Sequence, residues 1–533
     1  MSNDKNGIAT LPEIARTGAN CVRLVWTAEY ENNHTLVELI ENCIANKMIA
    51  MPECHSATGE WENLNICINF WKDTVLIKGI QKNKKWTLLN IGNEVGDASV
   101  NDFQFKTGYK AAVDSLRSWG YTVPLVIDAS TWGQNVDIIL NTWKEILAHD
   151  PLQNIIFSVH SYWPTTENYN RVASESINEG IPVIIGQGPS PSAYPDCNIL
   201  DFGTGLTISG KNDVGWLAWS WGAVNNGHCV PNFDLATDGK FGNWETVYAS
   251  SMMADHPFSL MKTAERPASF FDNDTIPVSG IYITPGIKNM MISDTIIIEV
   301  LVAPSNATMK GYTIEISGDE SAASYNQNTG MLVGLTAGEI KVKAIMNDKD
   351  SLSFTRTIEI KEVPVSTITI YPSEAELYIN DTLFLTVEVL PANATRKEFT
   401  FQVIDNFSVI EFDESTGMIV AKNTGNAVVK AIWMNGDIEG IIDITVYDPT
   451  GEGLIKHGNI PNIYPIPNQD LLHIDIPDYL PFHLLIIDIS GRVVIDENFT
   501  GSTTVETHHL IPGFYEAVLQ IRDEIVRQKV VIL

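Results

Sequence analysis

A glutamate that follows a short apolar run is the first residue suited to catalysis. Glu94 comes after Gly92 and Asn93, at the end of the apolar stretch Thr87–Ile91. A carboxylic acid at the end of a buried strand can protonate a leaving oxygen, which is general acid catalysis. Asn93 could hydrogen-bond a hydroxyl next to the reacting carbon. The residues leave one alternative open, which is an ordinary loop glutamate.

Other polar and aromatic side chains lie in or after apolar runs. Arg23 lies inside the run Cys21–Trp26, where a charge is costly unless it is paired. We expect Arg23 either to orient a catalytic carboxylate or to form a structural ion pair. Histidine and aromatic residues end or follow four further runs: His55, Trp132, His160, Tyr162, Trp219 and Trp221. We expect these side chains either to contact the hydroxyls and rings of a sugar or to belong to the core. His160 and Tyr162 are two positions apart, so an extended chain places them on one face, and the last two tryptophans share this spacing.

The elements that must position these residues alternate between short apolar runs and longer amphipathic stretches, over residues 1 to about 270. This alternation predicts a parallel sheet with helices between its strands. The expected strands are Cys21–Trp26, Met48–Pro52, Thr87–Ile91, Pro124–Ile127, Ile155–Val159, Pro182–Ile185 and Gly215–Trp219. Expected helices include Thr10–Thr17, with Thr10 as its cap and Gly18 as its stop, and Phe105–Trp119, closed by Gly120.

Closed barrels of this kind have eight strands, and their functional residues lie at the C-terminal ends of those strands. We therefore predict a (β/α)8 TIM barrel whose first strand is missing from this chain. The segment Met1–Asn6 has no apolar core after a basic patch, so we expect no signal peptide there. Both absences fall at the same end, which predicts that the chain is truncated upstream.

Residues beyond Pro277 are rich in aspartate, threonine and β-branched residues, in short alternating runs. Four sequence blocks recur there at a constant offset of 87 positions. They are Val278–Ile281 with Val365–Ile368, Pro304–Thr308 with Pro391–Thr395, Thr329–Met331 with Thr416–Met418, and Val342–Ile345 with Val429–Ile432. A constant offset indicates two duplicated domains, whose length and short strands suggest β-sandwiches. A third β-rich unit follows them.

Composition and charge exclude several classes of protein. The chain has 533 residues and a formal net charge of −31, so nucleic acid and anionic membrane surfaces are not expected partners. No run of 18 apolar residues occurs, so no membrane span is expected. The six cysteines form no CxxC pair, so we expect no metal site and mostly free buried thiols. A disulfide between Cys197 and Cys229 is the alternative. We expect no cofactor and a monomer.

Six motifs on successive expected strands resemble glycoside hydrolase family 5, and most of all its bacterial β-mannanase branch, over residues 7 to 265. They are Gly18–Arg23, His55–Gly59, Ile91–Glu94, Asp128–Gln134, His160–Tyr162 and Gly215–Trp221. The resemblance implies that Glu94 is the general acid/base of a retaining glycosidase. It also implies a set of substrate-binding residues around the scissile sugar: Arg23, His55, Asn93, Trp132, His160, Tyr162, Trp219 and Trp221.

The chain departs from this family at the nucleophile. The family has I-G-E-F-G or a similar segment where this chain has Ile184–Pro189, so Gln187 stands in place of the carboxylate. Retaining hydrolysis needs two carboxyl groups about 5–5.5 Å apart, one of which attacks the sugar. Asp196 and Asp201 lie in the following loop, but neither is an obvious substitute.

Three functions are compatible with this departure. The first is a retaining endo-β-1,4-glycanase, with mannan favoured over cellulose, in which Gln187 has replaced the nucleophile. The second is a carbohydrate-binding pseudoenzyme that uses the same cleft without hydrolysis. The third is an adhesin whose repeats carry the function.

The C-terminal half resembles two further families. The repeats resemble group 2 bacterial Ig-like domains, and the last unit resembles the sorting domain of type IX secretion through Asp488–Arg492 and Leu510–Tyr515. The usual Y-P-N-P opening of the sorting domain is altered at Tyr464–Asn468, and a third small sandwich is the alternative. The implied domains are a barrel at 1-272, Ig-like domains at 277-362 and 364-448, and a sorting domain at 458-533. This organisation implies a secreted or cell-surface protein whose partners are β-mannan or a related β-1,4-glycan and the type IX secretion machinery.

Overall fold

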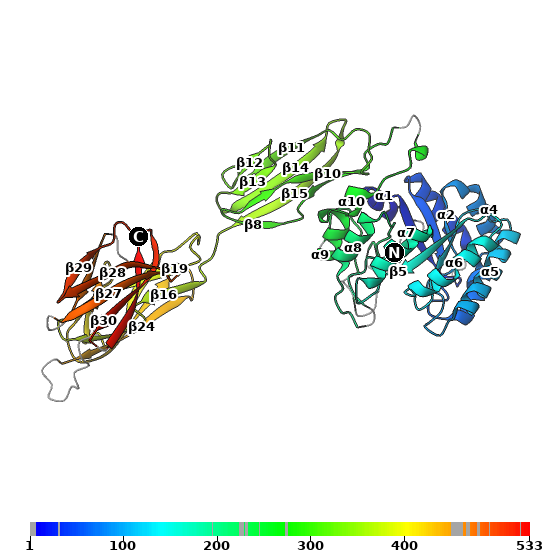
Figure 1. Ribbon diagram of the computed structural model, residues 1–533. Helices are drawn as coiled ribbons and strands as arrows, with labels where there is room; N and C mark the ends of the chain where they lie inside the picture. The colour runs from blue at the N-terminus through cyan, green and yellow to red at the C-terminus, as the bar shows by residue number, and fades with distance from the viewer. Residues whose placement is uncertain are drawn as a thin grey trace. The chain divides into compact units, whose positions relative to one another are not determined.

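The computed structural model describes residues 7–29, 32–193, 196–222, 229, 233–244, 246–271, 275–448, 462–464, 470–476, 480–489, 491–522 and 524–533 (Figure 1). Predictions that concern Met1–Asn6, the segment Pro465–Asn468 and Ser490 lie outside these residues. No helix in the described ranges is long and apolar enough to cross a membrane.

The N-terminal part contains a curled parallel sheet whose strands follow one another in chain order. Its strands are β1 (Cys21–Trp26), β2 (Ile49–Cys54), β3 (Leu89–Asn90), β4 (Leu125–Asp128), β5 (Ile155–His160) and β6 (Val183–Gln187). Within the described ranges, β1 pairs only with β2, so none of these strands occupies its other edge. The apolar side chains of the strands and of the surrounding helices form one buried core.

Helices connect and flank these strands, as the blue and cyan part of Figure 1 shows. They are α1 (Thr10–Ala15), α2 (Asn33–Ala45), α3 (Leu64–Phe70), α4 (Thr74–Lys82), α5 (Asp102–Ser118), α6 (Val136–His149), α7 (Glu167–Glu179), α8 (Phe202–Lys211), α9 (Val247–Ser250) and α10 (Leu260–Thr263). Helix α5 begins earlier than predicted because Asn101 and Gln104 form a capping box at its start. Thr10 is the first residue of α1 and not its cap, since Ala9 holds that position without a side-chain hydrogen bond.

The segment predicted as the strand Gly215–Trp219 runs beside β6 but is too irregular to form a full strand. A parallel bridge joins Trp216 to Ile185 in β6. Gly215 and Leu217 form backbone hydrogen bonds of 2.9 Å with Ile185, and Leu217 O accepts from Gly188 N at 2.8 Å. The chain then leaves the sheet, because the backbone N–H of Ser220 donates to Phe233 O and its carbonyl accepts from Leu235 N, at 2.9 and 3.0 Å. A contact between segments so far apart in sequence cannot be read from a local apolar pattern.

The expectation of mostly free thiols is also corrected for one pair. Cys197 and Cys229 form a disulfide with their Cα atoms 5.2 Å apart, so the alternative pairing is confirmed. Cys43, Cys54 and Cys67 are buried free thiols, and Cys21 is half-buried.

The two repeats form β-sandwiches, and seven of their nine strand pairs have bounds that match at the offset of 87 residues. The first has β7 (Gly280–Thr284), β8 (Asn289–Met291), β9 (Thr295–Ile297), β10 (Glu299–Ala303), β11 (Tyr312–Gly318), β12 (Ala323–Asn326), β13 (Met331–Gly334), β14 (Gly338–Met346) and β15 (Lys349–Lys361). The second has β16 (Thr367–Tyr371), β17 (Glu374–Tyr378), β18 (Thr382–Phe384), β19 (Thr386–Leu390), β20 (Phe399–Asp405), β21 (Ile410–Asp413), β22 (Met418–Ala421), β23 (Gly425–Trp433) and β24 (Glu439–Tyr447). Sheet order also corresponds, with β11-β14-β15-β8 in the first repeat and β20-β23-β24-β17 in the second.

The last unit packs two smaller sheets, β25-β26-β29 and β28-β27-β30-β31, around its own apolar core. Its strands are β25 (Asn462–Tyr464), β26 (Leu471–Asp475), β27 (Pro481–Asp488), β28 (Val493–Thr500), β29 (Thr503–Glu506), β30 (Gly513–Ile521) and β31 (Glu524–Ile532). The architecture is therefore the predicted barrel fold followed by all-β sandwiches. The four domain boundaries stay predictions.

Candidate active site

Arg23 on β1 lies at the centre of a buried group of charges. Its Nη2 contacts the carboxylate of Glu53 on β2 and lies 3.0 Å from Asp128 Oδ2 on β4. Both carboxylates are fully buried, and Arg23 is almost so. Burial would lower the pKa of Arg23, but the charges of Glu53 and Asp128 outweigh this and raise the pKa. The contacts favour the structural ion pair among the two readings of Arg23.

Glu94 is joined to this charge group through His160. His160 Nδ1 lies 2.6 Å from Glu94 Oε1, and His160 Nε2 lies 3.4 Å from Asp128 Oδ2. The backbone N–H of Glu94 also donates to Asp128 Oδ2 at 3.1 Å. Burial alone would lower the pKa of His160, but Asp128 and then Glu94 raise it to about 8. At neutral pH the imidazole is therefore a charged donor that holds the Glu94 carboxyl in place.

Gln187 ends β6 and lies beside the residue that precedes Glu94. Tyr162 OH donates to Gln187 Oε1 at 2.8 Å, and Gln187 Nε2 lies 3.5 Å from Asn93 Oδ1. Asn93 Oδ1 also accepts from Arg23 Nη2 at 2.7 Å. Burial, with a further contribution from Glu94, raises the pKa of Tyr162 well above its usual value, so the phenol stays a neutral donor. The side chain of Gln187 is thus held on two sides as an uncharged amide.

The backbone around Gln187 leaves no room for side chains on its neighbours. A Cβ atom on Gly186 would lie 2.1 Å from Ser158 Oγ, and one on Gly188 would lie 1.8 Å from Ser161 Oγ. Gly188 also has a φ of +127°, a conformation that only glycine adopts readily. The position of Gln187 therefore follows from the close contact between β5 and β6.

His55 follows β2 and is anchored to the same charge group. Its Nδ1 lies 2.8 Å from Glu53 Oε1, and its side chain is 30% exposed. Burial opposes the charged imidazole, but the hydrogen bond to Glu53 outweighs it and raises the pKa of His55. His55 therefore lies next to the Arg23 group with part of its ring accessible.

The three predicted tryptophans, Trp132, Trp219 and Trp221, lie in different surroundings. Trp132 is 45% exposed, which favours a wall of the cleft over a core position. Trp221 packs partly buried against the barrel core. The carbonyl of Trp219 accepts a hydrogen bond from Tyr248 OH at 3.1 Å. The core alternative is therefore better supported for Trp221 than for Trp132.

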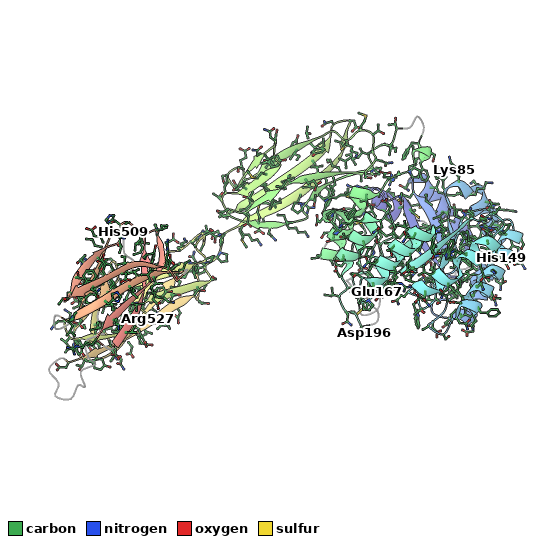
Figure 2. The ribbon with its side chains drawn as sticks, in the orientation of Figure 1. Lys85, His149, Glu167, Asp196, His509 and Arg527 are labelled. Atoms are coloured by element: carbon green, nitrogen blue, oxygen red, sulfur yellow. A yellow bond between two sulfur atoms is a disulfide. The ribbon has the colours of Figure 1, made fainter. Side chains whose placement is uncertain are left out.

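Two site residues were missed by the sequence analysis. Glu53 and Asp128 follow the predicted strands Met48–Pro52 and Pro124–Ile127, so the signal that selected Glu94 applied to both. Asp201 instead caps α8 by accepting from Thr204 N at 2.9 Å. Asp196 lies at the periphery of the barrel in Figure 2. Among the described residues, no group of three or more His, Cys, Asp and Glu side chains is arranged to hold a metal ion.

The raised pKa of His160 predicts a loss of stability in alkaline solution. A folded-state pKa of about 8 against an ordinary value of 6.5 contributes stability that is complete below pH 6.5 and is lost as the pH rises through 8. A difference of this size corresponds to about 2 kcal/mol. Urea unfolding at about pH 6 and pH 9 measures it, and the His160→Asn variant should lose less free energy over that interval. An equal loss of unfolding free energy in the unmodified chain and in His160→Asn would show that His160 is not the source of the pH dependence.

Comparison with known proteins matches three parts of the chain to family models. A family model described as cellulase (glycosyl hydrolase family 5) matches residues 1–225. Residues 364–437 match the bacterial Ig-like domain (group 2), and residues 462–533 match the secretion system C-terminal sorting domain.

Individual relatives match the barrel. A mannan endo-1,4-beta-mannosidase of Salipaludibacillus agaradhaerens is 32% identical over 276 residues, which are 50% of this chain and 85% of the relative. A mannan endo-1,4-beta-mannosidase of Cellvibrio japonicus is 26% identical over 250 residues, 44% of this chain and 56% of the relative. The solved β-mannanase from Thermomonospora fusca shares 25% identity over 50% of this chain and 90% of its own, with a TM-score of 0.46.

The family model and the 32% identical relative show that the chain belongs to glycoside hydrolase family 5. Both relatives described above are mannan endo-1,4-beta-mannosidases, so the chain is a glycoside hydrolase homologue of the mannanase type. A group 2 Ig-like domain and a C-terminal sorting domain follow the barrel, and the sorting domain supports a secreted or cell-surface protein.

Proposed function

We propose that the barrel binds a β-1,4-linked mannan at the C-terminal ends of its strands and that Gln187 prevents hydrolysis by the retaining route. The observation that carries this proposal is the amide of Gln187, hydrogen-bonded to Tyr162 and lying beside Asn93. Retaining hydrolysis needs a carboxylate at this place to attack the sugar. Glutamine has the same size and shape as glutamate, so the site can still receive the sugar.

Nearby acids are poor substitutes for the missing nucleophile. Glu53 and Asp128 are fully buried and paired with Arg23, so neither is free to attack a sugar from the cleft. Glu94 keeps the surroundings expected of a general acid/base, with His160 as its partner. Under this proposal Glu94 supplies one of the two carboxyl groups that hydrolysis needs, and Gln187 leaves the other missing.

The remaining site residues have roles in binding under this proposal. Asn93 and Tyr162 face the sugar beside the reacting carbon, and His55 donates to a hydroxyl. Trp132 and Trp219 provide flat faces for the C–H surfaces of sugar rings. The ligand is an extracellular β-mannan, which a monomer exported by the type IX secretion machinery would meet outside the cell. This exported protein is a carbohydrate-binding member of a hydrolase family.

Exposed Trp132 provides a test of sugar binding. We expect Trp132→Ala to weaken binding of mannohexaose by roughly 30-fold, because truncation of a tryptophan at the centre of a binding surface commonly costs about 2 kcal/mol. Titration calorimetry with the full chain measures this change. Phe103→Ala is the matched control, since Phe103 is 72% exposed on α5 and should leave the affinity unchanged.

Cellohexaose in the same titration distinguishes mannan from glucan. Preference for mannohexaose is the expected result. Failure of the unmodified chain to bind either sugar would contradict the proposal, as would equal losses in the Trp132 and Phe103 variants.

A further inference from the structure

The barrel and the first Ig-like repeat share one apolar cluster, which we call the junction core. Both belong to the same compact unit of the chain. The barrel contributes Leu235, Ala236, Phe241, Trp244 and Tyr248, and the repeat contributes Tyr282, Leu301, Ala303 and Phe354. The Tyr282 ring lies 4.3 Å from that of Trp244 and 4.7 Å from that of Phe354. Rings at this spacing exclude water and pack as in a protein interior.

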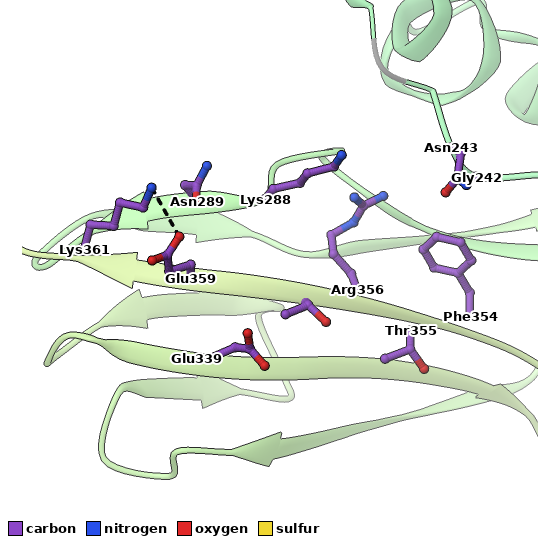
Figure 3. A pocket seen from close by; sticks show the side chains of 11 residues that line it. Gly242, Asn243, Lys288, Asn289, Glu339, Phe354, Thr355, Arg356, Glu359 and Lys361 are labelled. Atoms are coloured by element: carbon purple, nitrogen blue, oxygen red, sulfur yellow. Dashed lines mark ion pairs between the residues drawn. The ribbon is translucent and has the colours of Figure 1, made fainter. Parts of the chain in front are cut away.

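Backbone atoms also approach closely across this junction. A Cβ atom on Gly280 in β7 would lie 1.9 Å from the carbonyl oxygen of Arg16, so only glycine fits there. Gly242 of the barrel similarly faces Phe354, whose ring would lie 2.5 Å from an added Cβ (Figure 3). Asn306 of the repeat exchanges two hydrogen bonds with the backbone of Arg266, at 3.1 and 2.9 Å. The repeat is therefore fitted to the barrel at the level of the backbone.

The second Ig-like repeat provides an internal comparison, because its strands match those of the first at an offset of 87 residues. At several positions of the junction core, and at Gly280, the two repeats carry different residues. Gly280, Tyr282, Leu301 and Ala303 correspond to Thr367, Thr369, Glu388 and Leu390, and strand pairing matches Phe354 with Gly440. If the second repeat took the place of the first, Thr367 would clash where Gly280 lies, and Glu388 would bury a charge where Leu301 lies. The docking face is a property of the first repeat and not of the Ig-like fold.

The junction core extends to the backbone of the candidate binding residue Trp219. Tyr248, one of its members, donates its hydroxyl to the carbonyl of Trp219 at 3.1 Å. Leu235, another member, donates its N–H to Ser220 O at 3.0 Å, and Ser220 N donates to Phe233 O at 2.9 Å. The backbone of residues 219–221 is therefore held by the barrel side of the junction core.

We propose that the first Ig-like repeat is a structural part of the sugar-binding site. Docked on the barrel, it packs Tyr282 against Trp244 and so fixes the residues that hold Trp219 and Trp221. Tyr282 is a positioning residue in this arrangement, since it acts through the junction core and touches no sugar. The consequence for sugar affinity rests on the function proposed above, whereas the consequence for the order of residues 219–221 does not.

Substitution by the residues of the second repeat tests this proposal in the full chain. In Tyr282→Thr and in Leu301→Glu, we expect hydrogen exchange at the Ser220 amide to rise about tenfold or more, because its local protection depends on the junction core. Exchange in β2 to β5 should stay unchanged, which shows that the barrel remains folded. Mannohexaose affinity should fall by about tenfold. Tyr282→Phe keeps the ring, so this variant should have the same Ser220 exchange rate and the same mannohexaose affinity as the unmodified chain.

The matched control is Glu388→Leu, which makes the reciprocal change in the second repeat and should alter neither readout. Unchanged exchange at Ser220 in both first-repeat variants would overturn the proposal. Lack of mannohexaose binding by the unmodified chain would instead contradict the proposed function, and the exchange measurement would still decide whether the repeat positions the cleft.

Discussion

Replacement of Gln187 by glutamate is expected to raise kcat for mannan hydrolysis by about 10⁴-fold or more, the factor by which loss of a nucleophile commonly lowers it. Glutamate has the size of glutamine, so it needs no new space beside Gly186 and Gly188. The neutral hydroxyl of Tyr162 can donate to a carboxylate oxygen as it does to the amide. The substitution therefore supplies the missing charge without changing the shape of the site.

Release of reducing ends from β-mannan by the full chain, with and without Gln187→Glu, measures this effect. Adding Glu94→Gln to the Gln187→Glu chain should abolish the gain, because retaining hydrolysis needs both carboxyl groups. The anomer first released should have the configuration of the substrate. A Gln187→Glu chain no faster than the unmodified one would show that something other than the nucleophile limits the reaction.

The second large effect is expected for Arg23→Met. Removing Arg23 takes away the cation that the buried carboxylates of Glu53 and Asp128 share, and leaves the imidazoles of His55 and His160 beside them. Breaking a buried ion pair from one side commonly costs about 3–5 kcal/mol, because the remaining charge keeps its desolvation penalty. The free energy of unfolding at neutral pH should fall by this amount.

Arg171→Met is the matched control in the same urea titration. Arg171 pairs with Asp137 and Glu175 on the surface, where such pairs contribute about 1 kcal/mol or less. Equal losses for the two variants would mean that the Arg23 group is as well solvated as a surface pair.

The sequence predicted the barrel well wherever strands follow local patterns. Strand β1 has the predicted bounds Cys21–Trp26, and the remaining strands of the sheet lie at or within three residues of their predicted positions. The offset of 87 residues also predicted the correspondence of strands in the two sandwiches. These features depend on the alternation of apolar residues and on duplication, which a single sequence displays.

Features that depend on distant contacts were not predictable in this way. The burial of Glu53 was not predictable, because β2 continues through Pro52 to Cys54 and so brings this carboxylate inside the sheet, opposite β1. The segment Gly215–Trp219 has the composition of a strand, but Ser220 pairs with Phe233 and Leu235. The partners of Arg23 were likewise hidden, since Asp128 is 105 residues away in sequence.

The candidate site residues were selected by position at strand ends, and the structure brings several of them together. Asn93, Tyr162 and Gln187 are connected by hydrogen bonds, and Glu94 contacts His160. Their catalytic and binding roles stay predictions. The order of barrel, repeats and sorting domain follows from recognisable motifs, whereas docking of the first repeat on the barrel required the structure.

The most direct test of a sugar-binding barrel without a nucleophile combines binding and cleavage in one sample. Mannohexaose is titrated into the unmodified full chain in a calorimeter, and the sugar is then recovered and separated by chromatography. We predict saturable binding and recovery of intact mannohexaose. Recovery of shorter mannooligosaccharides at the rate given by the Gln187→Glu chain, or the absence of binding heat, would contradict the role assigned to Gln187.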